Sequence, residues 1–169
     1  GRSEFEVVVR PLRGKSALEN YTPGKDVSKK MLKLVAKPAT HSDHGLQHWL
    51  RVHDIGMVLA DATAGCDRKV VSVFAMTHDT QRKNELTDPD HGRRASEFVV
   101  KHQKYLDLSD SQVRILTSAL DFHDDGHTTT DPTIGVCWDA DRLDLPRVGI
   151  LPDSKYLSTK AALDLMWTI

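Results

Sequence analysis

VVSVFAMTHD, residues 70–79, joins a helical pattern of apolar side chains to a histidine and an aspartate. Val70 and Phe74 fall on one face at helical spacing, which predicts a buried helix from Val70 to His78. Adjacent side chains on a helix point about 100° apart. His78 and Asp79 can still converge on one ion if that ion lies beyond the helix end. The stretch is therefore a candidate metal-binding position at the end of a core helix.

The helical pattern continues on both sides of this stretch. Further helices are expected over 27–37, 42–62, 92–105, 112–124, 132–145 and 158–169, with a polar loop over 82–91. The expected N-caps are Asp26, Asp67, Ser109 and Asp131. The sequence thus predicts an all-α fold, with one helical domain over 26–169. Residues 1–25 form an N-terminal extension without a helical pattern, in which Phe5–Val9 has the composition of a short strand.

Composition excludes several classes of function. The chain has 169 residues, with 23 lysines and arginines against 24 aspartates and glutamates, which argues against a broad surface for duplex nucleic acid. No apolar run approaches the roughly 18 residues that cross a bilayer, so no membrane association is expected. Cys66 and Cys137 cannot form a disulfide framework and suit a reducing compartment, which predicts a cytoplasmic protein. The nine histidines are unusually many, and most lie between His41 and His127.

Several of these histidines share the apolar faces of expected helices. His48, His123 and Asp141 each lie on such a face, and His91 begins a further helix. For any one of them, a core hydrogen bond or a helix cap is the more common role. An unpaired carboxylate that faces inward is costly, however, and Asp141 faces inward beside Trp138. Imidazole and carboxylate groups suit Mn, Fe, Zn, Ni or Mg. Four such groups complete one metal site, and six with a shared carboxylate can hold two.

Three motifs resemble the HD superfamily of metal-dependent phosphohydrolases. They are HGLQHWLRV with His48, FAMTHD with the pair His78 and Asp79, and DADRLD with Asp141. The HD pair alone is a weak signal, whereas the three motifs in this order are specific. The resemblance implies a helical bundle of the HD-domain type. It also implies that His48, His78, Asp79 and Asp141 bind a metal ion.

Some members of this superfamily hold two metal ions, and they carry two more histidines between the HD pair and the last aspartate. His91 in DPDHG and His123 in LDFHDDGH occupy that order. The gap between Asp79 and His91 is short, so contact of His91 with substrate is an alternative to metal binding. We therefore expect one or two divalent ions per chain, chosen from Mn, Fe, Ni, Zn and Mg.

A hydrolase of this kind uses a metal-activated water and needs cationic groups for the phosphate. Asp79 is expected to orient that water, and Arg82 and Lys83 to act as a phosphate clamp in the loop beyond it. Further candidate substrate contacts are Arg51, His127 and Arg142. Each of these has a plain structural alternative, in a solvated loop, a turn or a surface ion pair.

The leading hypothesis is hydrolysis of a small phosphate ester, which by resemblance is a nucleotide. One alternative is a mixed-valent di-iron oxygenase of the HD type, because two-metal members include oxygenases of the myo-inositol oxygenase type. The other is a non-catalytic module that binds a nucleotide or a metal. The expected partner is a small phosphorylated substrate. A homodimer is compatible with the apolar last helix, which carries Leu163, Met166 and Trp167.

Overall fold

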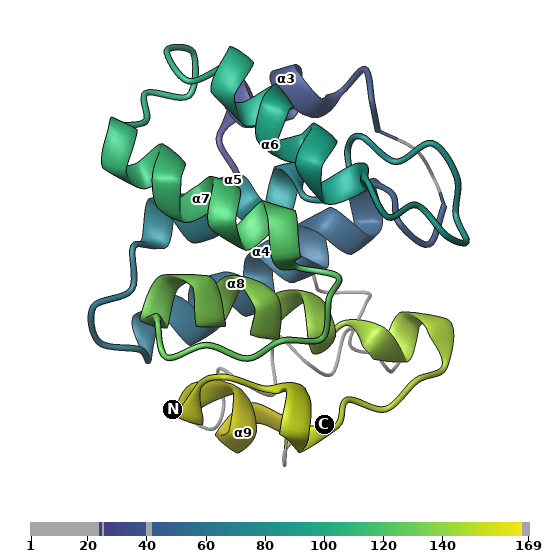
Figure 1. Cartoon of the computed structure of the whole chain (residues 1–169), viewed down its shortest axis with the longest axis vertical. Coiled ribbons are helices and arrows are strands. Elements are labelled where there is room, and N and C mark those ends of the chain that lie inside the picture. Colours follow the sequence, from purple (N-terminus) through teal and green to yellow (C-terminus); the bar gives the residue numbers. More distant parts are fainter. Residues whose placement is uncertain (1–23, 25, 40–41, 167–169) are drawn as a thin grey trace.

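The computed structural model describes residues 24, 26–39 and 42–166, and all of their regular secondary structure is helical (Figure 1). The α-helices are α3 (Lys29–Val35), α4 (Leu46–Asp61), α5 (Arg68–Thr77), α6 (His91–Lys101), α7 (Asp110–Phe122), α8 (Pro132–Arg142) and α9 (Lys160–Met166). Two short 3-10 helices, η2 (Leu145–Val148) and η3 (Ser154–Tyr156), connect α8 to α9. The predicted all-α class is confirmed, whereas the strand considered at Phe5–Val9 lies outside the described residues.

Local capping explains where most of the helices begin. The carboxylate of Asp67 accepts hydrogen bonds from the first turn of α5, and Asp131 accepts one at the start of α8. Ser109 forms a full capping box with Gln112 at the start of α7. These three caps were predicted correctly.

The cap predicted for the first of these helices is wrong. Ser28, not Asp26, is the N-cap of α3, and its hydroxyl accepts a hydrogen bond from the amide of Met31. Asp26 lies too early because a turn, closed by the Val27 amide and the Gly24 carbonyl, precedes the helix. The chain therefore enters helical geometry two residues later than the sequence pattern indicated.

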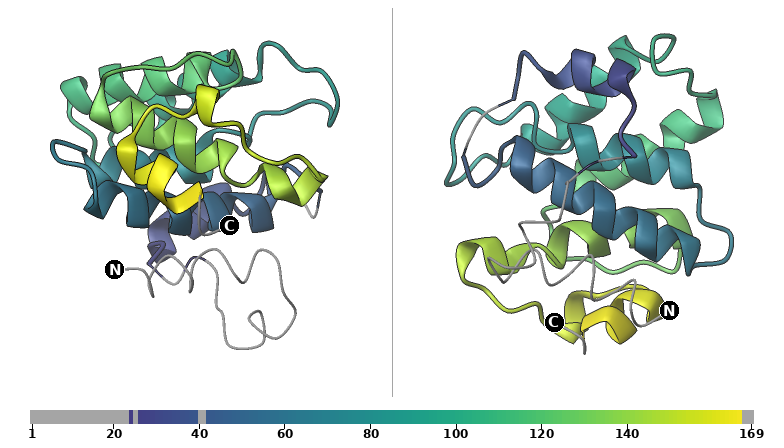
Figure 2. Two further views of the ribbon diagram at one scale, coloured as in Figure 1. Left: turned by 90° about the horizontal axis from the view of Figure 1, so that it is seen from below. Right: turned by 180° about the vertical axis from the view of Figure 1, so that it is seen from behind.

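The helices α4 and α5 form the centre of the bundle. The helix α8 packs against both of them, α7 packs against α5 and α8, and α6 pairs with α7. The short α3 contacts α5, while α9 contacts α8 at the opposite end of the molecule (Figures 1 and 2). Trp49, Phe74 and Leu120, from three different helices, are among the fully buried side chains of the core. Leu163 and Met166 of α9 are partly buried against this core.

A glycine sets the closest approach between α6 and α7. A β-carbon at Gly92 would lie closer to the carbonyl oxygen of Leu120 than van der Waals contact allows. Only glycine therefore fits this contact without a shift of the backbone. The contact brings the start of α6, with His91, against the end of α7, with His123.

None of the described helices has the length and apolar character that a membrane span requires.

Candidate metal centre

The structure brings together all six side chains predicted as metal ligands. His48 lies on α4, His78 and Asp79 at the end of α5, His91 at the start of α6, His123 at the end of α7, and Asp141 on α8. The four histidines and Asp79 are buried, and the side chain of Asp141 is 17% exposed. Five helices that meet at one point thus supply the donor atoms.

The first group of donors consists of His48, His78, Asp79 and Asp141. The Nε2 atoms of His48 and His78 are 3.0 Å apart, and each lies 3.1–3.4 Å from Oδ1 of Asp141 and Oδ2 of Asp79. Ligands bound about 2.1 Å from one ion lie about 3.0 Å apart at right angles and about 3.4 Å apart at tetrahedral angles. The donor atoms of His48, His78 and Asp79 therefore lie close enough together to hold one metal ion, with Oδ1 of Asp141 beside both histidine nitrogens.

The second group uses the other oxygen of Asp79. The Nε2 atoms of His91 and His123 are 2.8 Å apart and lie 3.4 Å and 3.8 Å from Oδ1 of Asp79. Asp79 therefore presents Oδ2 to one group and Oδ1 to the other. Each group could hold a metal ion, and the carboxylate of Asp79 would then bridge the two.

Hydrogen bonds at the far side of each ring fix which nitrogen faces the centre. The Nδ1 atoms of His78, His91 and His123 donate to the backbone carbonyls of Ala75, Asp88 and Leu120, and Nδ1 of His48 lies 2.7 Å from Oδ2 of Asp144. A carbonyl oxygen can only accept, so each of these Nδ1 atoms carries the proton. A ring without a second proton then turns the lone pair of Nε2 inward, which is the usual arrangement of metal-binding histidines.

These donor atoms are arranged to suit a bound cation better than a site without one. Within each histidine pair, the two Nε2 atoms face each other at hydrogen-bond distance, and two neutral rings would have no proton to share there. A metal ion between them satisfies both lone pairs and the nearby carboxylates. Burying polar atoms without such a partner is costly. The residues present are therefore a chemically complete ligand set for one or two metal ions.

The charges of the centre are strongly coupled. Burial lowers the pKa of His48, but contacts with Asp141, Asp144 and Asp79 raise it more, to about 10, so this ring carries a second proton at neutral pH when no metal is bound. Burial raises the pKa of Asp79 and of Asp141, but the neighbouring histidines outweigh it and hold both pKa values well below the usual range. Both carboxylates are therefore ionised at neutral pH. Protons and metal ions compete for the same histidines, so metal binding releases protons.

The loop 82–90 closes one side of the centre. Arg82 lies beside it, with Nε 3.4 Å from Oδ1 of Asp79 and no hydrogen-bond partner for that buried nitrogen. Lys83, the other predicted clamp residue, has an exposed side chain, and the described residues show no contact between it and the centre. Buried Asp88 anchors the loop by binding Arg94 and the amide of Lys83. Because the carbonyl of Asp88 also accepts from His91, this loop helps to position a ligand.

Two arginines predicted to contact substrate are held by other groups. Nε of Arg51 donates to Oδ1 of Asp144 at 3.0 Å, on the far side of His48 from the centre. The guanidinium of Arg142 is buried and donates to the backbone carbonyls of His127 and Tyr156. The side chain of His127 is exposed on the loop after α7, and its carbonyl is the part that makes this bond. Arg51 and Arg142 thus support the walls of the centre.

Sequence reasoning missed Asp144 and the position of His44. Asp144 is 1% exposed and accepts from both His48 and Arg51. Its position in DADRLD, three residues after Asp141, was the available signal, since residues three apart share a helix face. Nδ1 of His44 lies 3.4 Å from Oδ2 of Asp79, while its Nε2 contacts the carbonyl of Glu85.

Two hollows open onto the centre. The larger, of about 560 Å³, is lined by His44, His123 and Asp141 together with Tyr156 and Val148. The smaller, of about 340 Å³, reaches His91 and His123 from the side of the loop. Both hollows are bordered by the exposed carboxylates that follow α7, Asp124 and Asp125. A small molecule can therefore reach the donors from outside.

Comparison with known proteins agrees with this geometry. No protein-family model matches the sequence, and no curated protein matches it. Among solved structures, the chain is similar to a predicted HD superfamily hydrolase from an uncultured Thermotogales bacterium, with a TM-score of 0.66 and 23% sequence identity. The match covers 92% of this chain and 90% of that one. This likeness shows the fold: the helical bundle that the motifs led us to expect is the fold of that predicted HD superfamily hydrolase.

Proposed function

We propose that this protein is a metal-dependent phosphohydrolase that cleaves a small phosphate ester with a metal-activated water. The observation that carries the proposal is the buried carboxylate of Asp79, which faces one histidine pair with each oxygen. A bound divalent ion lowers the pKa of a water molecule and neutralises charge on a phosphoryl oxygen. The named function of the structurally similar protein, a predicted hydrolase, supports the same class of reaction.

The charge of the centre favours a phosphate group as substrate. Asp79 and Asp141 supply two negative charges, because their pKa values lie well below the usual range. With two divalent cations held, four positive charges would face these two negative ones. The remaining positive charge complements the dianion of a phosphate monoester. Mn, Fe, Ni, Zn and Mg all suit the imidazole and carboxylate donors.

Side chains of the protein would orient the water and bind the phosphate group. Asp79 holds its position between the two histidine pairs and would orient the water toward phosphorus. Arg82 lies beside Asp79 with an unpartnered Nε, so its guanidinium can donate to a phosphate oxygen during the reaction. Lys83 remains a proposed second cation, since its exposed side chain is free to move toward the phosphate.

A nucleotide is the substrate class that we propose. The hollow of about 560 Å³ is within the size range of small-molecule sites. The ring of Tyr156 is 42% exposed and borders this hollow together with Leu145 and Val148, which offers a flat apolar surface for a base. The phosphate group would lie in the same hollow, near Asp141 and His123.

The test is release of inorganic phosphate from nucleoside monophosphates, with p-nitrophenyl phosphate as a generic ester and each candidate metal supplied in turn. We expect turnover by the wild type and by Asp164→Ala, an exposed carboxylate on α9, and none by Asp79→Ala. Turnover of the generic ester, with no turnover of any nucleotide, would refute the nucleotide class but not the hydrolase. Absence of all turnover from protein that carries metal would contradict the hydrolase.

A di-iron oxygenase is the second candidate, because two histidine pairs lie on either side of the carboxylate of Asp79, which could bridge two iron ions. The measurement that separates the two is oxygen consumption by the iron-loaded protein. Consumption that depends on Asp79 would favour the oxygenase. If neither phosphate release nor oxygen consumption is found in metal-loaded protein, the centre belongs to a non-catalytic binding module.

A further inference from the structure

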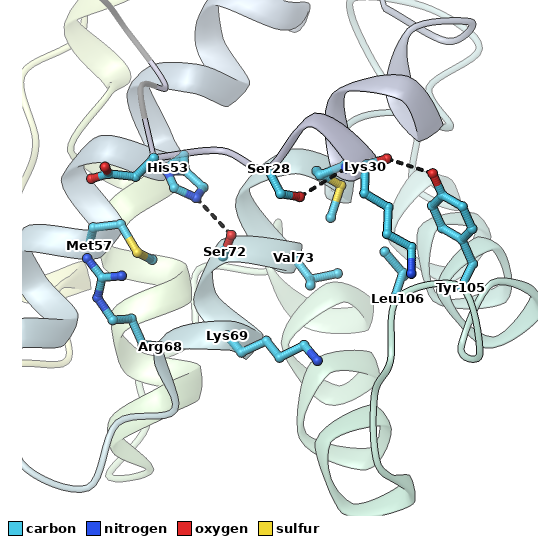
Figure 3. Close-up of a pocket in the computed structure, with 12 residues that line it drawn as sticks. Ser28, Lys30, His53, Met57, Arg68, Lys69, Ser72, Val73, Tyr105 and Leu106 are labelled. Carbon is cyan, nitrogen blue, oxygen red and sulfur yellow. Dashed lines mark hydrogen bonds between the residues drawn. The ribbon is translucent and has the colours of Figure 1, made fainter.

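A separate pocket of about 430 Å³ lies between α3, α4, α5 and the turn after α6 (Figure 3). None of the described residues that line it belongs to the metal centre. Its apolar lining includes Met31, Met57 and Val73, all of them buried. Volume and lining match those of pockets that hold small organic molecules, which combine an apolar surface with a few polar groups.

Three cations surround this apolar surface. Figure 3 shows Lys30 reaching in from α3 and Lys69 from the start of α5, with Val73 between them in this view, while Arg68 lies on the side of Met57. The described lining contains one carboxylate, Asp26, against these three positive charges. Nε of Arg68 is paired with the carboxylate of Asp61 at 3.0 Å, so the positive charge available in the pocket is that of Lys30 and Lys69.

The present partners of the cations are weak or replaceable. Nζ of Lys30 lies 4.5 Å from the centre of the Tyr105 ring, and the described residues offer it no carboxylate. Nζ of Lys69 donates to the backbone carbonyl of Asp107, whose own carboxylate is 3.9 Å away and almost fully exposed. Exposed ion pairs of this kind contribute little to stability. Both ammonium groups are therefore available to an anion that enters the pocket.

A buried histidine gives the wall a further polar group. His53 is 1% exposed, with Nε2 2.8 Å from Oγ of Ser72, and its Nδ1 has no hydrogen-bond partner. Burial lowers the pKa of His53 to about 4, so the ring is neutral at pH 7. A neutral ring does not repel a hydrogen-bonding ligand of either charge. An unpaired polar atom in a buried wall is unusual and is satisfied when a ligand or water binds.

We propose that this pocket is a binding site for a small organic anion, with an apolar or aromatic body and one acidic head group. The body would pack on Met31, Met57 and Val73, and the carboxylate, sulfonate or phosphate head would lie between Lys30 and Lys69. The site is independent of the proposed reaction, since it shares no lining residue with the metal centre.

The experiment uses 1-anilinonaphthalene-8-sulfonate as the probe, followed by fluorescence and calorimetry on the full chain. We expect one probe molecule per chain and at least tenfold weaker binding to Lys30→Glu/Lys69→Glu. The control, Arg114→Glu/Lys160→Glu, makes the same charge change at exposed positions outside the pocket and should bind within about twofold of the wild type. Lys30→Arg/Lys69→Arg should retain binding. Circular dichroism checks that each variant is folded.

A neutral analogue, N-phenyl-1-naphthylamine, separates charge from apolar packing. Its binding should change far less than that of the sulfonate when the two lysines are reversed in charge. The proposal is overturned if Lys30→Glu/Lys69→Glu binds the sulfonate as well as the charge-matched control does. It is also overturned if the sulfonate binds at several equivalent places with no saturation at one molecule per chain.

Discussion

Replacing Asp144 by asparagine should weaken the first metal position without unfolding the protein. In the wild type, Oδ2 of Asp144 accepts from His48 at 2.7 Å and Oδ1 accepts from Arg51 at 3.0 Å. An asparagine side chain has one oxygen and one NH2 group, so it can accept a hydrogen bond on one side only. Either His48 or Arg51 then faces the NH2 group, which donates and cannot accept. The charge that favours binding by His48 is lost as well.

The size of the effect follows from the role of Asp144 as the partner of a ligand. Loss of such partners weakens metal binding by about 10-fold to 100-fold, which corresponds to about 1.4–2.7 kcal/mol. The side chain of Arg51 is 21% exposed and can rotate into solvent. The free energy of unfolding should therefore fall by less than it would for a fully buried charge. The four donors of the first group should lose affinity, and the pair His91 and His123 should lose much less.

Competition with a fluorescent chelating indicator at fixed pH measures both affinities. Asp164→Asn, an exposed carboxylate on α9, is the matched control and should leave both unchanged. The reasoning is refuted if folded Asp144→Asn protein binds two ions as tightly as the control does. It is equally refuted if the second position weakens more than the first.

Three further outcomes are expected. Arg82→Ala should lower kcat/KM on a phosphate ester by about 10-fold to 100-fold with metal content unchanged, because a charged hydrogen bond is lost, whereas the exposed Arg93→Ala should have little effect. Gly92→Ala should lower the free energy of unfolding by about 1–3 kcal/mol and weaken metal binding at His91 and His123 first. The third concerns His53, whose buried ring has its pKa lowered to about 4. The contribution of its neutral form to the free energy of unfolding is complete above pH 6.5 and is lost as the pH falls toward 4. Between pH 7 and pH 5, the free energy of unfolding measured by chemical denaturation should therefore fall by about 2 kcal/mol more in the wild type than in His53→Gln.

Local signals explain why most of the fold was predictable. The helix starts at Asp67, Ser109 and Asp131 depend on hydrogen bonds within one turn of the chain, and a sequence pattern contains that information. The cap of α3 was misplaced because Asp26 and Ser28 are both good capping residues two positions apart. Which of them caps depends on the turn that precedes the helix, and this turn is set by tertiary contacts.

The candidate metal ligands were predictable for a different reason. His48, His78, Asp79 and Asp141 lie in motifs that can be recognised, and the structure places both carboxylates within 3.4 Å of both histidine Nε2 atoms. The supporting groups were not predictable, because their contacts join distant parts of the chain. Asp144 is 96 residues from His48; its place in DADRLD indicates a helix face shared with Asp141 but not the contact with His48.

The same limit applies to the predicted substrate contacts. Arg82 follows Asp79 by one helical turn, so its place beside the centre follows from local geometry. The position of Arg142 depends on the loop after α7 and on η3, whose carbonyls of His127 and Tyr156 bind its guanidinium. A sequence shows that an arginine is present but not which carbonyls will surround it.

Metal content per chain tests the central claim most directly. Elemental mass spectrometry on protein purified without chelator, and again after reconstitution and desalting, should find about two divalent ions in the wild type. Asp79→Ala should lose both, because each oxygen of Asp79 serves one histidine pair, while Asp164→Ala should keep both. Wild-type protein that takes up no ion, or Asp79→Ala protein that retains two, would contradict a bridged metal centre at the junction of these five helices.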